Sequence, residues 1–387
     1  MKYNPGKSIK ATSPQGEAYL AFLPEIINKD FSWEDKRIDT LLESARGWLG
    51  ELNAYSKLIP NVDFFIQSHV AKEAEQSSRI EGTKTTLEEL YVEKENFDDP
   101  EKVNDQEEVK NYINALNYAI ESISTPNKPP LSIRLVCESH KELLAGVRGY
   151  KRHPGEIRKI QNKIGGSAGN IKDAVFIPPS PDIVPSLLND LEEFWHNKNL
   201  EIPDLIKVAL SHYQFETIHP FEDGNGRIGR LIIILQFISY GMLQKPTLYL
   251  SEYFEKNRSA YYDALSRVRE SGDMEHWIKF FLVGVAETAK KGKETLEKII
   301  DLQKKYEGLI ESYLGVKQQK LGKELLKHLF AKPVITAKDV ELMLNVTKPT
   351  ATSIVNKLSE SNMLSERTGY KRNRVYALNE YLELFNK

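Results

Sequence analysis

The spacing of apolar residues predicts a mainly helical protein. Apolar side chains recur every three to four positions over several long segments, which is the period of an amphipathic helix. The clearest of these segments cover residues 41–59, 62–80, 205–218, 227–238 and 277–286. The segment 290–305 is charged but keeps a helical pattern, so we expect it to connect two parts of the chain.

Short strands are predicted in two places. Residues 158–164 alternate polar and apolar side chains, 165–170 form a turn cluster, and 174–177 can return as a second strand, which together predict a β-hairpin. Near the C-terminus, helices are expected at 322–330, 336–344 and 347–358, followed by strands at 363–366 and 374–378. Helix, turn, helix and hairpin in this order resemble a winged helix.

Breaks in the pattern divide the chain into four parts. Residues 1–20 hold two Pro/Gly turn signals and are expected to be loose, while 98–100 and 124–130 are natural linkers. The expected fold class is mainly α, a helical bundle with a small β-hairpin flap and an α+β C-terminal domain. The predicted parts are an N-terminal helical region 1–100, a core 101–290, a connector 291–320 and a winged helix 321–387.

Composition narrows the protein class. The chain has 387 residues, of which 40% are hydrophobic, and a net charge of -2, so it can bury a core and has no global attraction to nucleic acid. The single cysteine, Cys137, excludes an internal disulfide framework. Because no secretory or transmembrane run is present, we expect a cytoplasmic protein without a membrane partner.

The chemistry is concentrated in residues 219–230, His-Pro-Phe-Glu-Asp-Gly-Asn-Gly-Arg-Ile-Gly-Arg. Pro220 disfavours the right-handed helical conformation at His219, so the helix over 205–218 should end there. Gly224 and Gly226 can take positive φ, which lets backbone N–H groups converge on an anion. The positive N-terminal end of the next helix faces the same point, so this loop suits a phosphate.

Side chains of the segment complete a phosphate site. Arg227 and Arg230 share one helix face and can clamp neighbouring phosphates. Asp223 makes sense in this cationic loop if it holds Mg²⁺ together with substrate phosphates. His219 can accept a proton at neutral pH, so the set fits phosphoryl or nucleotidyl transfer to a hydroxyl.

Three alternatives explain less. A calcium loop fails because Arg227 occupies its fifth position and Ile234 the place of its closing glutamate. A plain glycine turn does not account for the charged residues around it. His212 and Glu216 are four apart but lack a third metal ligand, so they are expected to be packing and solvent-facing residues.

Residues 219–230 resemble the Fic family signature at every position, and 154–158, 176–179, 248–251 and 261–262 extend the resemblance. Membership implies transfer of AMP from ATP, with Mg²⁺, to a Ser, Thr or Tyr hydroxyl of a target protein. The resemblance makes His219 the base, Asp223 the metal ligand and Phe221 a buried anchor. The implied nucleotide-binding residues are Gly224, Asn225 and Gly226 for the α- and β-phosphates, Arg227, Ile228, Gly229, and Arg230 for the γ-phosphate.

A second segment resembles the family's inhibitory motif. It runs from Ser77 to Gly82, with Ser78 as a candidate nucleotide contact, and on residue pattern alone it is also a charged helix that stops at Gly82. Ser77 and Glu81 are one helical turn apart and face the same way. We expect Glu81 to form a bidentate pair with Arg230, which would block the γ-phosphate site within the same chain.

Other sites are predicted from weaker patterns. The flap over 155–179 is expected to dock the target protein by strand addition, and Tyr253, Asn257 and Tyr262 to form the adenine pocket, unless they only pack. Residues 331–387 hold nine Lys or Arg and six Asp or Glu, with a basic tip at 368–374, so the C-terminal domain binds DNA or docks a protein, including a second copy. The alternative functions are a DNA-binding regulator that senses nucleotide, and a Fic enzyme that removes AMP or uses another nucleotide.

Overall fold

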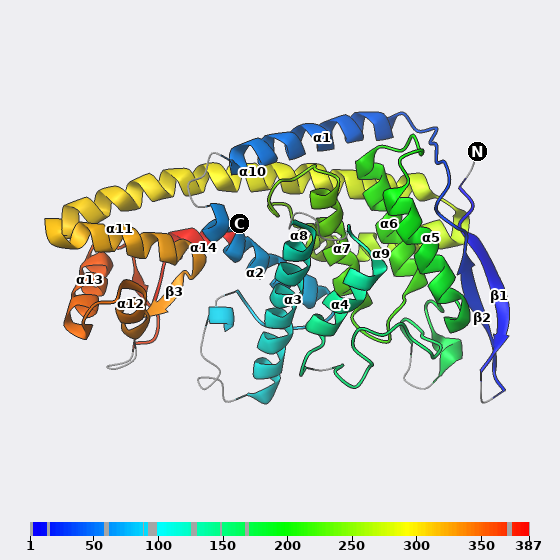
Figure 1. The fold of residues 1–387 in the computed structure, drawn as a ribbon, viewed down its shortest axis with the longest axis horizontal. Helices are drawn as coiled ribbons and strands as arrows, with labels where there is room; N and C mark the ends of the chain where they lie inside the picture. Colours follow the sequence, from blue (N-terminus) through cyan, green and yellow to red (C-terminus); the bar gives the residue numbers. More distant parts are fainter. Residues whose placement is uncertain are drawn as a thin grey trace.

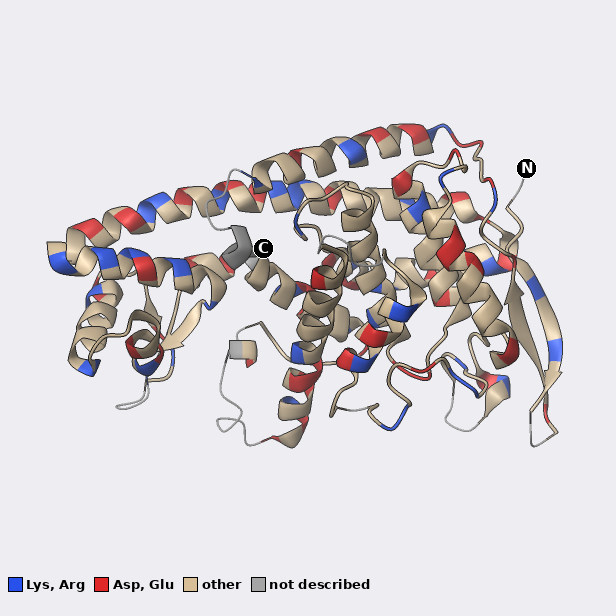
Figure 2. Cartoon of the chain, viewed as in Figure 1, with Lys and Arg blue, Asp and Glu red and all other residues tan. Residues whose placement is uncertain are grey.

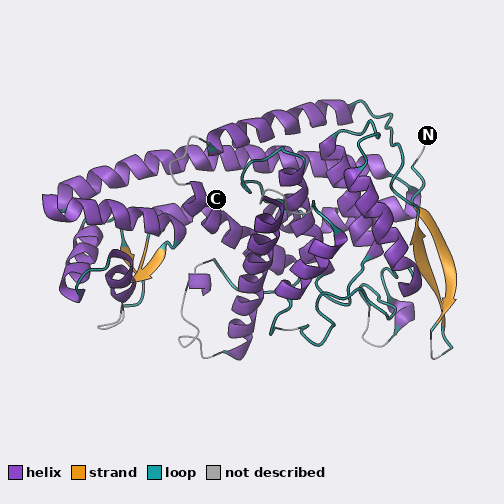
Figure 3. Cartoon of the chain, in the orientation of Figure 1, coloured by secondary structure: helices purple, strands orange, loops and turns teal. Residues whose placement is uncertain are grey.

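The computed structural model describes residues 3–13, 16–57, 62–87, 89–91, 99–124, 130–147, 149–166, 170–369 and 374–386. These residues form a mainly helical fold with two small sheets, which confirms the predicted fold class (Figures 1 and 3). None of the helices in these ranges is both long and apolar enough to cross a membrane. Lys, Arg, Asp and Glu are intermingled along the outer helices, in keeping with the small net charge (Figure 2).

A single helix, α10 (Met274–Tyr313), runs along most of the molecule (Figure 1). The predicted helix 277–286 and the charged segment 290–305 are both parts of it, so the boundary placed at residue 290 lies inside a continuous helix. Helix α1 (Arg37–Ser56) packs along α10. Gly292 of α10 faces Leu52 of α1, where an added Cβ would lie 3.2 Å from the leucine side chain.

The central bundle surrounds two buried helices, α6 (Asp204–Ile218) and α7 (Asn225–Ser239). Every residue of α6 from Leu205 onward is buried, as expected for a helix enclosed on all sides. The bundle also contains α3 (Pro100–Ser124), α4 (Ile133–Leu143), α5 (Val184–His196), α8 (Ser251–Lys256) and α9 (Arg258–Ser271). Short 3-10 helices lie at Glu89–Tyr91, Ile171–Asp173 and Pro181–Ile183.

Helix α2 (Val62–Ile80) has the bounds predicted for the inhibitory helix. It packs against α3, α7, α8 and α11, so it is enclosed by both the bundle and the C-terminal helices. The Ser68 hydroxyl donates to the Phe330 carbonyl at the end of α11 (2.9 Å). Helix α2 is therefore a built-in part of the fold.

The prediction of a loose N-terminus is wrong. Strands β1 (Gly6–Thr12) and β2 (Ala18–Pro24) form an antiparallel hairpin, with Gly6 opposite Pro24 and Thr12 opposite Ala18. Gly6 of the first Pro/Gly cluster begins β1, and residues 14 and 15 of the second cluster lie outside the described part of the chain. The Phe22 N–H donates to the Ile177 carbonyl (2.9 Å), which joins the hairpin to the flap.

The flap has less strand than expected. The two predicted strands reduce to one antiparallel bridge between Ile164 and Phe176, and residues 167–169 lie outside the described part of the chain. Pro178 and Pro179 lack N–H donors, and their carbonyls are held by side chains instead. Gln161 donates to Pro178 (2.9 Å) and Arg158 donates to Pro179 (2.5 Å).

The C-terminal residues follow the predicted order of helices and strands. Helix α11 (Val316–Ala331) precedes a three-stranded antiparallel sheet, whose strands lie in the order β3 (Val334–Thr336), β5 (Val375–Ala377) and β4 (Ser365–Glu366). Strand β3 and the final helix of the chain were not predicted. The described tip ends at Gly369 and resumes at Arg374, so 370–373 of the predicted basic tip lie outside it. The remaining elements are α12 (Ala337–Leu344), α13 (Lys348–Glu360) and α14 (Asn379–Asn386).

Candidate active site

His219 ends α6 as predicted. Its backbone is left-handed (φ 51°, ψ 62°) and its N–H donates to the Phe215 carbonyl (2.9 Å), while Pro220 prevents a further helical turn. Burial, followed by the nearby Arg158 guanidinium, lowers the pKa of the His219 imidazole to about 4. The ring is therefore neutral at pH 7 and can accept a proton.

Arg158 holds His219 in place, a role that the sequence analysis missed. Its buried guanidinium donates to the carbonyls of His219 (2.8 Å), Ile218 (3.4 Å), Pro179 and Ile160. These contacts place a positive charge at the C-terminal end of α6, where carbonyl groups have no helical partners. Arg158 is the last residue of 154–158, one of the segments that carry the family resemblance. This position is the sequence signal that could have identified Arg158.

The signature loop is braced from inside by polar side chains. The Asn225 amide accepts from the Phe221 N–H and donates to the Phe221 carbonyl (both 2.8 Å), and Asn162 donates to the same carbonyl (2.7 Å). Phe221 is buried, as predicted, and its ring stacks on His140 at 3.8 Å. The side chain of Asn225 thus stabilises the loop, and its backbone begins α7.

His140 is a second residue that the sequence analysis missed. The Gly155 N–H donates to its Nδ1 (2.8 Å), so Nε2 carries the proton and donates to the Asp223 carbonyl (2.9 Å). Burial lowers the pKa of this imidazole to about 4. A neutral histidine therefore orients the backbone of the predicted metal ligand.

Only one of the two glycines expected to take a positive φ does so. Gly224 has φ 77°, but Gly226 lies in the first turn of α7 with helical backbone. A Cβ on Gly226 would lie 2.3 Å from Glu81 Oε1, so this glycine makes room for the carboxylate. Ile228 is buried in the core and Gly229 contacts the Glu216 carboxyl, so both lie behind the loop.

Asp223 fits a Mg²⁺ ligand. Its side chain is 44% exposed, and one oxygen accepts from the Gly224 N–H (2.6 Å). Within the described ranges, no three His, Cys, Asp or Glu side chains gather as a metal cluster. A single exposed carboxylate suits Mg²⁺, which keeps waters and shares its coordination with substrate phosphates.

Arg230 is held by the C-terminal end of α2 and the turn that follows it. The side chain is 2% exposed, and it donates from Nε to Ser77 Oγ and from Nη2 to the Ser77 carbonyl and to Glu81 Oε1 (all 2.8 Å). The predicted bidentate pair is wrong, because Glu81 accepts from Nη2 alone, through Oε1, while Nε and Nη2 also donate to Ser77. Burial acts to raise the pKa of Glu81, but the Arg230 charge lowers it on balance.

The turn after α2 positions Glu81. Gly82 has φ 104°, a conformation that favours glycine, and the N–H groups of Glu81 and Thr83 both donate to the Ser78 carbonyl. The Ser78 hydroxyl is buried and has no hydrogen-bond partner among the described residues. Its predicted contact with nucleotide stays a prediction.

His212 and Glu216 have different outcomes. His212 packs as expected, with its ring nitrogens 3.2 Å from the Gly229 carbonyl and 2.8 Å from the Tyr261 hydroxyl. Glu216 was expected to face solvent but is buried, and burial raises the pKa of its carboxyl to about 7. The residue fits because Gly229, which lacks a side chain, leaves space for it.

The adenine pocket of Tyr253, Asn257 and Tyr262 stays a prediction. The Tyr253 ring packs against Gly284 and Phe280 of α10, and Asn257 donates to the Tyr253 carbonyl (2.9 Å). Tyr262 is 42% exposed, and the pKa of its phenol is raised by burial and by the nearby Glu81 carboxylate. Of the three residues, Tyr262 is the one whose charge environment includes the Glu81–Arg230 pair.

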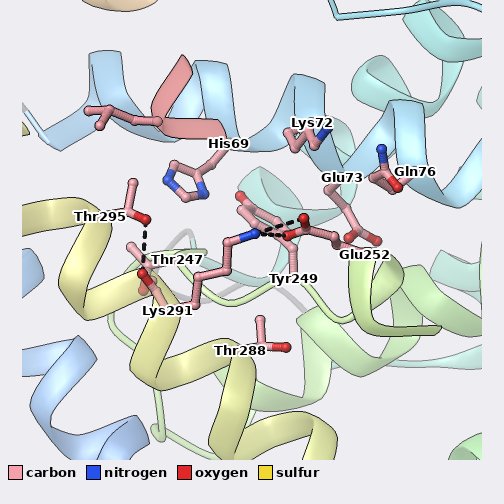
Figure 4. Close-up of a pocket in the computed structure, with 12 residues that line it drawn as sticks. His69, Lys72, Glu73, Gln76, Thr247, Tyr249, Glu252, Thr288, Lys291 and Thr295 are labelled. Carbon is pink, nitrogen blue, oxygen red and sulfur yellow. Dashed lines mark hydrogen bonds and ion pairs between the residues drawn. The ribbon is translucent and has the colours of Figure 1, made fainter. Parts of the chain in front are cut away.

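A cavity of about 50 Å³ lies beside the middle of α2 (Figure 4). His69 and Glu73 line it from α2, and Lys291 of α10 pairs across it with Glu252 of α8 (2.7 Å). Glu73 accepts from the Ser251 hydroxyl (2.5 Å) and the Tyr112 hydroxyl (3.1 Å). Buried polar contacts thus fix α2 upstream of Ser77.

Comparisons with known proteins agree with this geometry. Residues 40–121 match the profile described as Fic/DOC family N-terminal, and residues 130–237 match the Fic/DOC family profile. The chain is a Fic/DOC family protein. Both Ser77–Gly82 and the 219–230 segment fall within the matched residues of this Fic protein.

Curated relatives of the Fic protein match only in part. The protein adenylyltransferase Fic of Aedes aegypti is 28% identical over 151 residues, which are 39% of this chain and 27% of that protein. The protein adenylyltransferase fic-1 of Caenorhabditis elegans is 26% identical over 191 residues, 49% of this chain and 33% of that protein. The chain therefore spans about a third or less of these relatives' length.

Solved structures share the fold. A Fic family protein from Desulfovibrio desulfuricans aligns with a TM-score of 0.56 at 18% identity, over 90% of this chain and 98% of that one. Fic-1 of Caenorhabditis elegans aligns with a TM-score of 0.51 at 21% identity, over 69% and 73% of the two chains. At such identities the likeness shows the fold alone.

Replacing Arg158 tests its structural role. We expect Arg158→Ala to lower the free energy of unfolding by about 2–4 kcal/mol, because several buried carbonyls lose a charged donor. Urea denaturation measures this loss. Arg152→Ala is the control, since Arg152 is exposed and should change stability by less than about 0.5 kcal/mol. Equal stability of the two variants would contradict the assignment.

Proposed function

We propose that this Fic protein transfers AMP from ATP to a hydroxyl of a target protein and is held inactive by Glu81. One observation carries the proposal: the buried Arg230 guanidinium is held by Ser77 and Glu81, beside a neutral His219. The relatives named as adenylyltransferases support it at the level of the family. The target docks on the flap at 155–179 in this proposal.

The proposed reaction uses residues of the braced loop. The oxygen of the target hydroxyl attacks the α-phosphorus of ATP, the bond to pyrophosphate breaks, and the hydroxyl proton passes to His219. Arg227 and the N–H groups at the start of α7 bind the phosphates, and Arg230 takes the γ-phosphate. A Mg²⁺ ion held by Asp223 would neutralise phosphate charge.

In this proposal, inhibition is relieved when another anion replaces Glu81 at Arg230. A guanidinium that is 2% exposed cannot be left without a partner at low cost, so Glu81 leaves only when another anion replaces it. Glu81 is 37% exposed, which weakens its hold compared with a fully buried pair. The γ-phosphate is a suitable replacement because it carries more charge and accepts the same hydrogen bonds.

The alternatives differ in what they require of His219. A DNA-binding regulator that senses nucleotide needs no base at this position, whereas the neutral imidazole here fits proton transfer. A Fic enzyme that removes AMP would use Glu81 to orient water, and the choice of nucleotide depends on the base pocket. The braced, neutral His219 favours an enzyme.

Removing Glu81 is expected to activate the protein. Glu81→Gly should raise AMP transfer from labelled ATP by about tenfold to a hundredfold, which corresponds to roughly 1.4–2.7 kcal/mol of released inhibition. Labelled protein bands in a cell lysate, identified by mass spectrometry, measure the effect. His219→Ala in the same background should abolish the signal, and no activation by Glu81→Gly would refute the inhibition.

The pH dependence follows from His219. A pKa lowered to about 4 keeps the base deprotonated at higher pH, so its contribution is lost only as pH falls through about 4. We therefore expect kcat/KM of the Glu81→Gly variant to stay level from pH 8 to about 6, without a midpoint near the usual histidine value of roughly 6.5. Initial rates with circular dichroism at each pH test this, and half-loss near pH 6.5 would contradict it.

A second proposal concerns the C-terminal domain, whose partner we propose to be DNA. The surface of α13 is polar over Lys348, Thr352, Ser353, Asn356 and Lys357, which suits contacts with phosphates and base edges. Binding of duplex DNA should weaken steeply with salt and fall when Lys348 and Lys357 are replaced by alanine. Absence of a gel shift at low salt would leave protein docking or a homodimer as its role.

A further inference from the structure

Helix α3 carries a buried polar face against the inhibitory helix. Asp105, Glu108 and Tyr112 occupy positions i, i+3 and i+7, which lie on one side of a helix, and all three are buried. Asp105 Oδ2 accepts from the Lys84 N–H (2.8 Å), and the Tyr112 hydroxyl donates to Glu73 of α2 (3.1 Å). This face therefore holds both α2 and the turn that follows Glu81.

Glu108 also reaches the signature. Its Oε2 lies 3.3 Å from Arg227 Nη1 and 3.5 Å from the Thr83 hydroxyl. Both side chains of the ion pair are at most 8% exposed. One carboxylate oxygen thus connects the first signature arginine with a residue only two positions beyond Glu81.

Both signature arginines are therefore paired with a carboxylate. Arg227 and Arg230 lie one turn apart on α7; Arg227 pairs with Glu108 of α3, and Arg230 pairs with Glu81 in the turn after α2. A nucleotide phosphate at Arg227 would lie close to the Glu108 charge. Like charges at short range in a poorly hydrated site repel strongly, so phosphate and Glu108 compete.

We propose that Glu108 is a second inhibitory carboxylate, which competes with nucleotide phosphates for Arg227 and links this competition to the Glu81 turn through Thr83. It is a positioning residue, because it acts through Arg227 and does not contact the reacting atoms. The inference rests on the proposed function, since it assumes that Arg227 binds phosphate. Full activation then requires both glutamates to give up their arginines.

ATP affinity tests this inference directly. His219→Ala prevents turnover, and isothermal titration with ATP and Mg²⁺ then compares this protein with forms that also carry Glu81→Gly, Glu108→Gln or both. With Glu81 absent, Glu108→Gln should still tighten ATP binding by roughly tenfold, the size expected of a hydrogen bond between charged groups. Glutamine keeps the shape of the side chain, and thermal unfolding verifies that each variant is folded.

Asp105→Asn is the matched control. Asp105 lies on the same face of α3 and holds the same turn, but its contact is with the Lys84 N–H, so ATP affinity in the Glu81→Gly background should stay within about twofold. If Glu108→Gln leaves ATP affinity unchanged or weaker in that background, Glu108 merely orients Arg227 and the inference is overturned. If no variant binds ATP, the proposed function fails and the inference with it.

Discussion

The need of a buried guanidinium for an anionic partner organises this protein. Arg230 lies in the interior between α2 and α7, where an unpaired positive charge would be costly. Burial acts to lower the pKa of Arg230, while the Glu81 carboxylate raises it, so the pair keeps the arginine charged. If Arg230 binds the γ-phosphate as we propose, the same need for an anion explains why Glu81 occupies it when no phosphate is bound.

Around this pair, the residues that fix the shape of the signature loop differ from those proposed to carry out the reaction. Asn225, Phe221 and Arg158 fix the loop through buried contacts with backbone groups. In the proposed function, His219, Asp223 and Arg227 are the residues that act on the substrate. Because the bracing side chains satisfy the carbonyls of an irregular segment, the loop can keep a left-handed residue at His219 without relying on a ligand for its shape.

Local signals account for what the sequence predicted well. The bounds of α2, the end of α6 at His219 and the start of α7 within two residues all follow from helical spacing, Pro220 and Gly224. The missed features depend on contacts between distant residues. Arg158 and His219 are separated by 61 positions, and Glu108 and Arg227 by 119, so no local pattern reports them. The β1–β2 hairpin was missed because its turn residues also suit a loose terminus.

The two residues that hold Arg230, Ser77 and Glu81, differ in how firmly they are themselves held. Ser77 lies inside α2, which is fixed by Ser68 on the Phe330 carbonyl and by Glu73 on Ser251. The Tyr381 hydroxyl of α14 donates to the same Phe330 carbonyl (2.9 Å), so the C-terminal helices share this anchor.

Glu81, in contrast, lies just past the last residue of α2, is partly exposed, and is followed by Gly82 with positive φ. In the proposed mechanism, exchange of Glu81 for phosphate therefore needs a change only in this turn, while Ser77 can keep its hydrogen bonds to Arg230. On this proposal, α2 and its turn both block the arginine and hold it in position for the phosphate.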